Sequence, residues 1–292
     1  MLQSGREDTS RDIISGIAVT CLIFGISGYL PIIGFLCALL LPLPILFYRS
    51  KIGRQKAVII SAVTMIIIGV SFGGISTDIL FFFGLLLLGF ILGECFELGL
   101  SIEKTVLYTA GSVLGALGFS LFFYSNVSHG GVISLLTEYV GKNLELTLAL
   151  YEEMGMPEEN ILLIANSLDS IGYVLVRIIP AMAAALTLFV TWTSILLAGP
   201  IMKSRNLFYP DFGSLKRWKA PEPLVWLVIG SGVAIVFPFQ SLKIIGLNFL
   251  IILMTIYFFQ GIAIVSFYFE KKGFPRLLKI FIYSIIAMQQ MV

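Results

Sequence analysis

The chain has 292 residues, of which 58% are hydrophobic and only 12% are charged, with Lys and Arg nearly balanced by Asp and Glu. A mean hydropathy of +0.99 excludes an ordinary soluble domain, because so few charged residues could not cover the surface of a water-soluble chain of this length. A bilayer removes that need, since each apolar run then becomes a membrane-spanning segment in contact with lipid.

Apolar runs bounded by charged or turn residues predict an all-α fold, a polytopic transmembrane helical bundle of about eight or nine spans. Several runs are shorter than the ~20 residues that cross ~30 Å of hydrocarbon, and the last leaves open whether it crosses. In chain order the runs are 13–28, 32–48, 57–72, 78–98, 105–124, 170–202, 224–239, 244–268 and 277–290.

The distribution of Lys and Arg predicts that the N-terminus is cytoplasmic. With that orientation 16 of the 19 basic residues fall on the inner side, and the exceptions are Lys142, Arg177 and Lys243. Such a bias follows the positive-inside rule and supports the span count, because one missed span would place the basic residues beyond it on the outer side. We expect a multi-pass protein of the bacterial cytoplasmic (inner) membrane.

Three predicted regions follow from this count. Residues 1–202 form a six-span N-terminal bundle, residues 203–223 form a basic cytoplasmic loop, and residues 224–292 form the C-terminal membrane helices. Small-residue spacing predicts helix-packing faces in the third and fifth spans, which carry Gly69 and Gly73, and Gly111, Gly115 and Gly118.

The fourth span ends in GECFELGLSIEKT, residues 93–105, where glutamates interrupt an apolar chain. A helix that continues to about Leu98 draws Glu94 and Glu97 into the inner leaflet, and their i, i+3 spacing puts both on one face. Carboxylates at that depth must be paired, protonated or exposed to a water-filled cavity. One interpretation is an interfacial pair held by Arg49, Lys51 or Lys104; the other is a ligand, proton or cation site.

An acidic outer segment, residues 125–169, separates the fifth and sixth spans. Residues 132–153 are amphipathic but too polar to span, and GMPEEN reads as a turn with a new helix beginning at about Pro157. We interpret the segment as a helical hairpin on the outer surface. It could cap a cavity, as long connections often do, or be a solvated connector.

Two polar positions lie within the later spans. Arg177 stands near Pro180, which predicts a kink or break, and is a candidate ligand-binding residue or a side chain that extends to the lipid headgroups. Asn248 interrupts the eighth span and is a candidate for ligand binding or for an interhelical hydrogen bond.

The basic loop contains PDFGSLKRWKAPEP, residues 210–223. Its mixture of aromatic and basic residues is typical of a membrane-interface connector. Lys216, Arg217, Trp218 and Lys219 are the residues that would dock a membrane or cytoplasmic protein partner.

Four strings carry a resemblance that extends over nearly the whole chain: LPIIGFLCALLLPLPILFYRSKIG, GECFELGLSIEK, PDFGSLKRWKAPEP and LNFLIILMTIYFFQGIAIVSFYFEKKG. With them the chain resembles the YybS-like family of predicted bacterial integral membrane proteins, which implies a membrane location but no site residues. The first six spans are also similar in plan to the substrate-binding components of energy-coupling-factor transporters. That similarity implies a small-molecule site covered by outer loops, although the three C-terminal spans have no counterpart there.

The sequence contains no metalloprotease, serine hydrolase or phosphate-loop motif and no cluster of aspartates. We therefore expect no enzymatic activity, no metal, no cofactor and no nucleic-acid partner. The favoured function is transport-related capture of a small solute by Arg177, Glu94, Glu97 and Asn248. The alternative is a membrane scaffold or assembly factor that docks partners through its basic inner loops.

Overall fold

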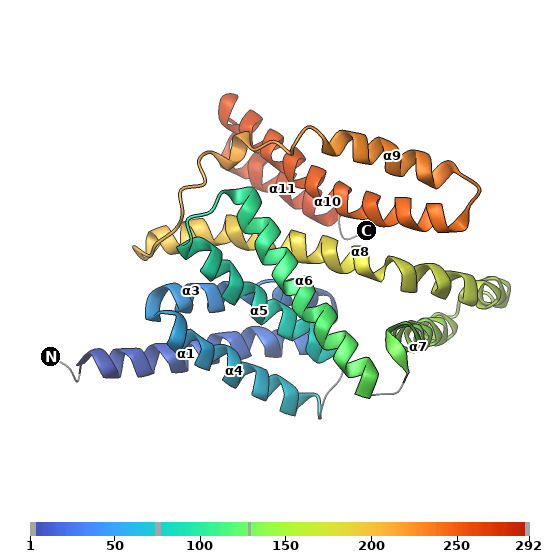
Figure 1. Ribbon diagram of the computed structural model, residues 1–292, viewed down its shortest axis with the longest axis horizontal. Helices are drawn as coiled ribbons and strands as arrows, with labels where there is room; N and C mark the ends of the chain where they lie inside the picture. Colours follow the sequence, from blue (N-terminus) through green and yellow to red (C-terminus); the bar gives the residue numbers. More distant parts are fainter. Residues whose placement is uncertain (1–3, 74–76, 128–129, 290–292) are drawn as a thin grey trace.

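A computed structural model describes residues 4–73, 77–127 and 130–289. Within these residues every regular element is a helix, which confirms the all-α bundle (Figure 1). The helices are α1 (Ser4–Tyr29), α2 (Pro31–Ala38), α3 (Pro42–Ile52), α4 (Arg54–Ser71), α5 (Thr77–Glu97), α6 (Ile102–Val127), α7 (Gly131–Glu153), α8 (Glu158–Ser204), the short η1 (Leu215–Arg217), α9 (Leu224–Val236), α10 (Gln240–Lys271) and α11 (Arg276–Gln289).

Seven stretches in the described residues are long and apolar enough to cross a membrane, and they agree with the first six expected spans and the eighth. The expected spans 224–239 and 277–290 form α9 and α11, which have 13 and 14 residues. At 1.5 Å per residue each covers about 20 Å, less than a bilayer's hydrocarbon core. The polytopic class is therefore confirmed, with seven stretches in the described residues that meet the length and composition of a span and Leu224–Val236 as a shorter apolar helix.

The second span is irregular, and prolines stand where its second helix begins. α2 ends at Ala38 and α3 begins at Pro42, so the chain makes a short break between two helices. Pro42 occupies the first turn of α3, where its missing N–H removes no helical hydrogen bond.

The predicted inner segments meet at one end of the bundle, which we call the basic end. It comprises the start of α1, the turn between α3 and α4, the turn between α5 and α6, segment 205–223, and the junction of α10 with α11 (Figure 1). Ion pairs join these parts: Lys51 to Asp12, Arg49 to Glu94, and Lys216 to Glu270. Their convergence agrees with the sidedness that the Lys and Arg distribution predicts.

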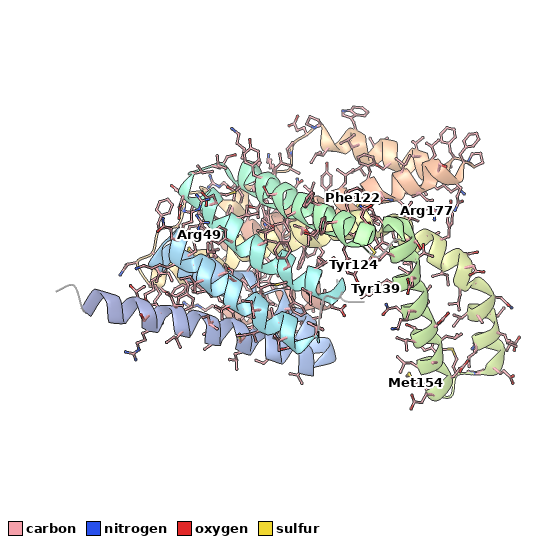
Figure 2. All side chains as sticks on the ribbon, turned by 60° about the horizontal axis from the view of Figure 1, so that its bottom comes forward. Arg49, Phe122, Tyr124, Tyr139, Met154 and Arg177 are labelled. Carbon is pink, nitrogen blue, oxygen red and sulfur yellow. The ribbon has the colours of Figure 1, made fainter. Side chains whose placement is uncertain are left out.

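The opposite end, which we call the hairpin end, carries α7 and the beginning of α8. The two form the expected helical hairpin, with Pro157 as the residue before α8, and they run across the spanning helices rather than along them (Figures 1 and 2). No residue of α7 is buried. Tyr139 ties the hairpin to the bundle, with its hydroxyl 3.4 Å from Asp78 Oδ1. α8 continues as one helix through Pro180, but its beginning runs across the spanning helices and its later part runs along them (Figure 2). Of the expected kink or break, the structure therefore shows a bend in α8 and no break.

Close helix contacts occur at glycines other than the predicted ones. A methyl group added at Gly69, Gly73, Gly111, Gly115 or Gly118 would meet no atom within 4 Å, so these glycines are not packing faces in this structure. The GxxxG pair that does pack is Gly89 and Gly93 of α5. A Cβ at Gly89 would lie 2.4 Å from the Pro42 carbonyl oxygen, so only glycine lets α3 approach so closely.

Candidate functional site

A buried arginine at the basic end holds α3 against α5. The Arg49 side chain is 0% exposed, and its Nη2 lies 2.6 Å from Glu94 Oε2 and 3.1 Å from Glu97 Oε2. Nη1 donates to the Phe90 carbonyl at 2.7 Å, and the guanidinium lies 4.7 Å from the Phe90 ring centroid. The structure therefore places both predicted glutamates in an ion-pair network.

Glycine makes room for this network. A Cβ at Gly93 would lie 2.5 Å from Arg49 Cδ and 2.8 Å from its Nε, so the guanidinium stem occupies the volume of the missing side chain. Arg49 Nε has no hydrogen-bond partner, although it is buried. The arginine is thus fixed by shape as well as by charge.

Lys51 and Arg54, two cations near Arg49, form ion pairs with different carboxylates. Arg54 donates to Glu94 Oε1 at 3.0 Å, and Lys51 pairs instead with Asp12 of α1 at 2.6 Å. Lys104, which the sequence also offered as a partner of the glutamates, forms no ion pair among the described residues. The arrangement matches the interfacial-pair interpretation of Glu94 and Glu97; binding of a ligand by these glutamates stays a prediction.

The other two predicted ligand residues lie at the hairpin end. Asn248 of α10 donates through Nδ2 to the Arg177 carbonyl oxygen at 3.1 Å, which links α10 to α8. The exposed Arg177 guanidinium lies 3.3 Å from the Tyr173 ring centroid and donates to the Tyr173 carbonyl. Asn248 is therefore the interhelical partner that the sequence allowed, and Arg177 contacts its own helix.

The four predicted ligand residues do not converge on one site. Arg49, which contacts Glu94 and Glu97, lies at one end of the bundle, and Arg177 lies at the other (Figure 2). A small solute cannot reach both sets, since the spanning helices separate them.

Segment 205–223 lies folded against the bundle. Trp218 Nε1 donates to Glu103 Oε1 at 3.0 Å, and its ring lies 4.3 Å from the Trp192 ring centroid of α8. Lys216 pairs with Glu270 at 3.0 Å. Of the four predicted docking residues, Arg217 and Lys219 are exposed and form no ion pair within the described chain.

A cavity of about 540 Å³, which we call the loop cavity, opens beside this segment. Its walls are α8, α10 and residues 209–216, and its lining includes the aromatic rings of Trp192, Tyr209, Phe212 and Phe259. The charged lining residues are Lys203, Asp211, Lys216 and Glu270. A second cavity of about 260 Å³ lies across the same segment, between it and the beginning of α6. Residues of the outer hairpin line neither cavity.

Tyr209 anchors one wall of the loop cavity. Its hydroxyl donates to the Ile195 carbonyl oxygen at 3.0 Å, and its ring packs edge-on against Phe96 and Phe212. Burial raises the pKa of Tyr209 to about 12, because the phenolate would lose hydration there. Lys203 Nζ lies 5.6 Å from the Tyr209 ring centroid and forms no ion pair among the described residues, so its charge at the cavity is not neutralised by a carboxylate.

The loop cavity could not be found from the sequence. Its walls come from residues 192–203, 209–216 and 259–270, and its aromatic residues carry no distinctive spacing in a chain that is 13% aromatic. The one available signal was PDFGSLKRWKAPEP, which supplies one wall. Among the described residues no group of three or more His, Cys, Asp or Glu side chains could hold a metal ion.

Comparisons with known proteins agree with this membrane architecture. Residues 18–292 match the family model described as predicted membrane protein (DUF2232). The chain belongs to the DUF2232 family. It is also 23% identical over 259 residues to the uncharacterised protein YybS of Bacillus subtilis (strain 168), an alignment that covers 85% of this chain and 80% of the relative.

No solved structure matches the chain. Family membership and the YybS relative confirm the YybS-like resemblance and a multi-pass membrane protein in contact with lipid. The resemblance to energy-coupling-factor components stays a prediction, because the family and the relative carry no transport description.

Proposed function

We propose that the protein captures a small solute in the loop cavity, as a transport-related, non-enzymatic component of the bacterial cytoplasmic membrane. The observation that carries this proposal is the cavity itself. Its volume of about 540 Å³ falls in the ~300–1,000 Å³ range of small-molecule sites, and its lining combines aromatic and aliphatic side chains with a few charged groups that could fix orientation.

The lining favours a solute with a planar or apolar body and at least one charged group. Trp192 and Phe259, packed against each other, form part of an apolar wall, and Lys203 offers a positive charge that forms no ion pair in the described chain. Asp211 and Glu270 offer the opposite charge, so a zwitterion also fits the lining. The placement in the cytoplasmic membrane is supported by the Lys and Arg distribution and by a relative from a bacterium.

Native mass spectrometry of the gently solubilised protein tests this proposal. We expect a bound molecule of defined mass in the wild-type protein. Ser214 lines the cavity and is exposed, so Ser214→Trp should block the opening and remove the bound molecule. The matched control is Ser204→Trp, because Ser204 is exposed but does not line the cavity.

A charge comparison sharpens the test. Lys203→Gln should weaken retention of a charged solute, whereas Arg205→Gln, two residues away and outside the lining, should not. Arg177→Ala distinguishes the two ends of the bundle: loss of the bound molecule in Arg177→Ala, with Ser214→Trp unaffected, would move the site to the hairpin end and refute the loop cavity.

A scaffold is the second candidate, favoured by the exposed and unpaired charges of Arg217 and Lys219. It predicts co-purifying proteins that are lost when both residues are changed to Glu. Co-purification of a protein partner without any small molecule would favour the scaffold over solute capture.

A further inference from the structure

Four cations gather where α10 passes into α11. They are Lys271, Lys272, Arg276 and Lys279, and none of them forms an ion pair within the described residues. The one carboxylate next to them in sequence, Glu270, is already paired with Lys216. The cluster therefore keeps its positive charge at the end of a spanning helix.

α11 has two unlike sides. One side contacts α10, where Tyr283 shares a 2.6 Å hydrogen bond with Ser266 and packs edge-on against Phe269. The other side carries large apolar side chains at i, i+3 and i+4, namely Leu277, Ile280 and Phe281, which are 82%, 62% and 62% exposed.

Length and position decide what covers that apolar side. With 14 residues α11 extends about 21 Å, too short to cross a bilayer. It begins directly after α10, so its first turn lies at the membrane surface of the basic end. Acyl chains at this depth suit the apolar residues, and headgroups suit the cations that neighbour them in sequence at the junction.

We propose that the junction of α10 and α11 is a binding site for anionic phospholipid. The four cations contact the phosphate-bearing headgroup, and Leu277, Ile280 and Phe281 contact the acyl chains. A cluster of four or more Lys and Arg immediately inside a spanning helix favours anionic lipid, with about a five-fold gain in association per cation near the surface. A nucleic acid or an acidic peptide would use the charges but would leave the adjoining apolar stripe uncovered.

The test is a lipid titration of the full-length, detergent-solubilised protein followed by native mass spectrometry. The two probes are phosphatidylglycerol, which is anionic, and phosphatidylcholine, which is zwitterionic. We expect the wild-type protein to prefer phosphatidylglycerol at least ten-fold. Changing all four cations to Gln should abolish the preference, while changing the three lysines to Arg should retain it.

A control with the same change of charge separates a local site from general attraction. Lys104, Arg205, Arg217 and Lys219 are exposed residues at the same end, and changing these four to Gln removes an equal charge. An equal loss of preference in this control would overturn the proposal, as would a Gln variant that keeps the preference. If the Gln variant fails to fold, raising the salt concentration with the wild-type protein gives a second readout, since screening should reduce the preference for phosphatidylglycerol.

Discussion

The ion pair between Arg49 and Glu94 offers the sharpest prediction of stability. Arg49→Met keeps most of the side-chain volume but removes the charge that contacts both glutamates and the Phe90 carbonyl. Removing one member of a buried pair costs about 3–5 kcal/mol. Here Glu94 retains Arg54, and the Glu94 and Glu97 side chains are 32% and 53% exposed, so water and Arg54 offset part of the loss. We therefore expect Arg49→Met to lower the free energy of unfolding by about 2–3 kcal/mol.

A double-mutant cycle isolates the pair from other effects of the substitution. Arg49→Met combined with Glu94→Gln should give a coupling free energy of about 1.5–3 kcal/mol, the range of hydrogen bonds to charged groups. The matched control lies two residues away, where Lys51 pairs with Asp12 at the same 2.6 Å separation but is 44% exposed. Because water screens that pair, the cycle of Lys51→Met with Asp12→Asn should give less than about 1 kcal/mol.

Both cycles can be measured by equilibrium unfolding in mixed detergent micelles, with helix content followed by circular dichroism. The expected difference comes from burial alone, because Arg49 and Lys51 both belong to α3 and both N–O distances are 2.6 Å. Equal coupling energies for the two pairs would refute it, as would single substitutions at Arg49 and Glu94 whose effects simply add.

Three further predictions concern neighbouring parts of the bundle. Gly93→Ala should lower the free energy of unfolding by about 1–3 kcal/mol, because its Cβ would overlap Arg49. Gly111 has open space around it, so Gly111→Ala should be neutral or stabilising by up to ~1 kcal/mol. Thermal unfolding compares the two variants. Asn248→Leu removes the hydrogen bond to α8 and should lower the free energy of unfolding by about 0.6 kcal/mol, and by no more than ~1.7 kcal/mol, in the same micelles. Tyr209 has a pKa of about 12 in the folded protein, so the unfolded chain loses its phenolic proton first, and stability should fall between pH 10 and 12. Tyr209→Phe should show a smaller fall over that interval, and an identical pH dependence would contradict the burial of this hydroxyl.

The sequence predicted those features that depend on local chemistry. Apolar runs located the spanning helices, and Pro157 located the turn of the outer hairpin, because hydropathy and proline geometry act over a few residues. Local reasoning also named Arg49 as one of three possible partners of Glu94, since a carboxylate drawn into a leaflet needs a cation from the same side, but it did not choose Arg49 over Lys51 and Lys104.

Features that depend on distant segments were not predictable. The packing glycines were assigned to Gly111 and Gly115, whereas the close contact occurs at Gly89 and Gly93, because GxxxG spacing does not reveal which helix face meets another helix. The predicted ligand set joined Arg177 to Glu94, but Glu94 pairs with Arg49, which lies at the opposite end of the bundle from Arg177 (Figure 2). Only the tertiary arrangement decides which intramembrane charges meet.

α8 is one continuous helix that connects the hairpin end of the bundle to the basic end. This helix forms half of the outer hairpin and, at its other end, supplies Trp192 and Lys203 to the loop cavity. Between Arg177 and Lys203 lie 26 residue steps, about 39 Å of helix, with no loop to absorb a rotation. A displacement of the hairpin would therefore reach the wall of the loop cavity through this one helix, and a solute bound in the cavity as proposed would be coupled to the hairpin end of the bundle.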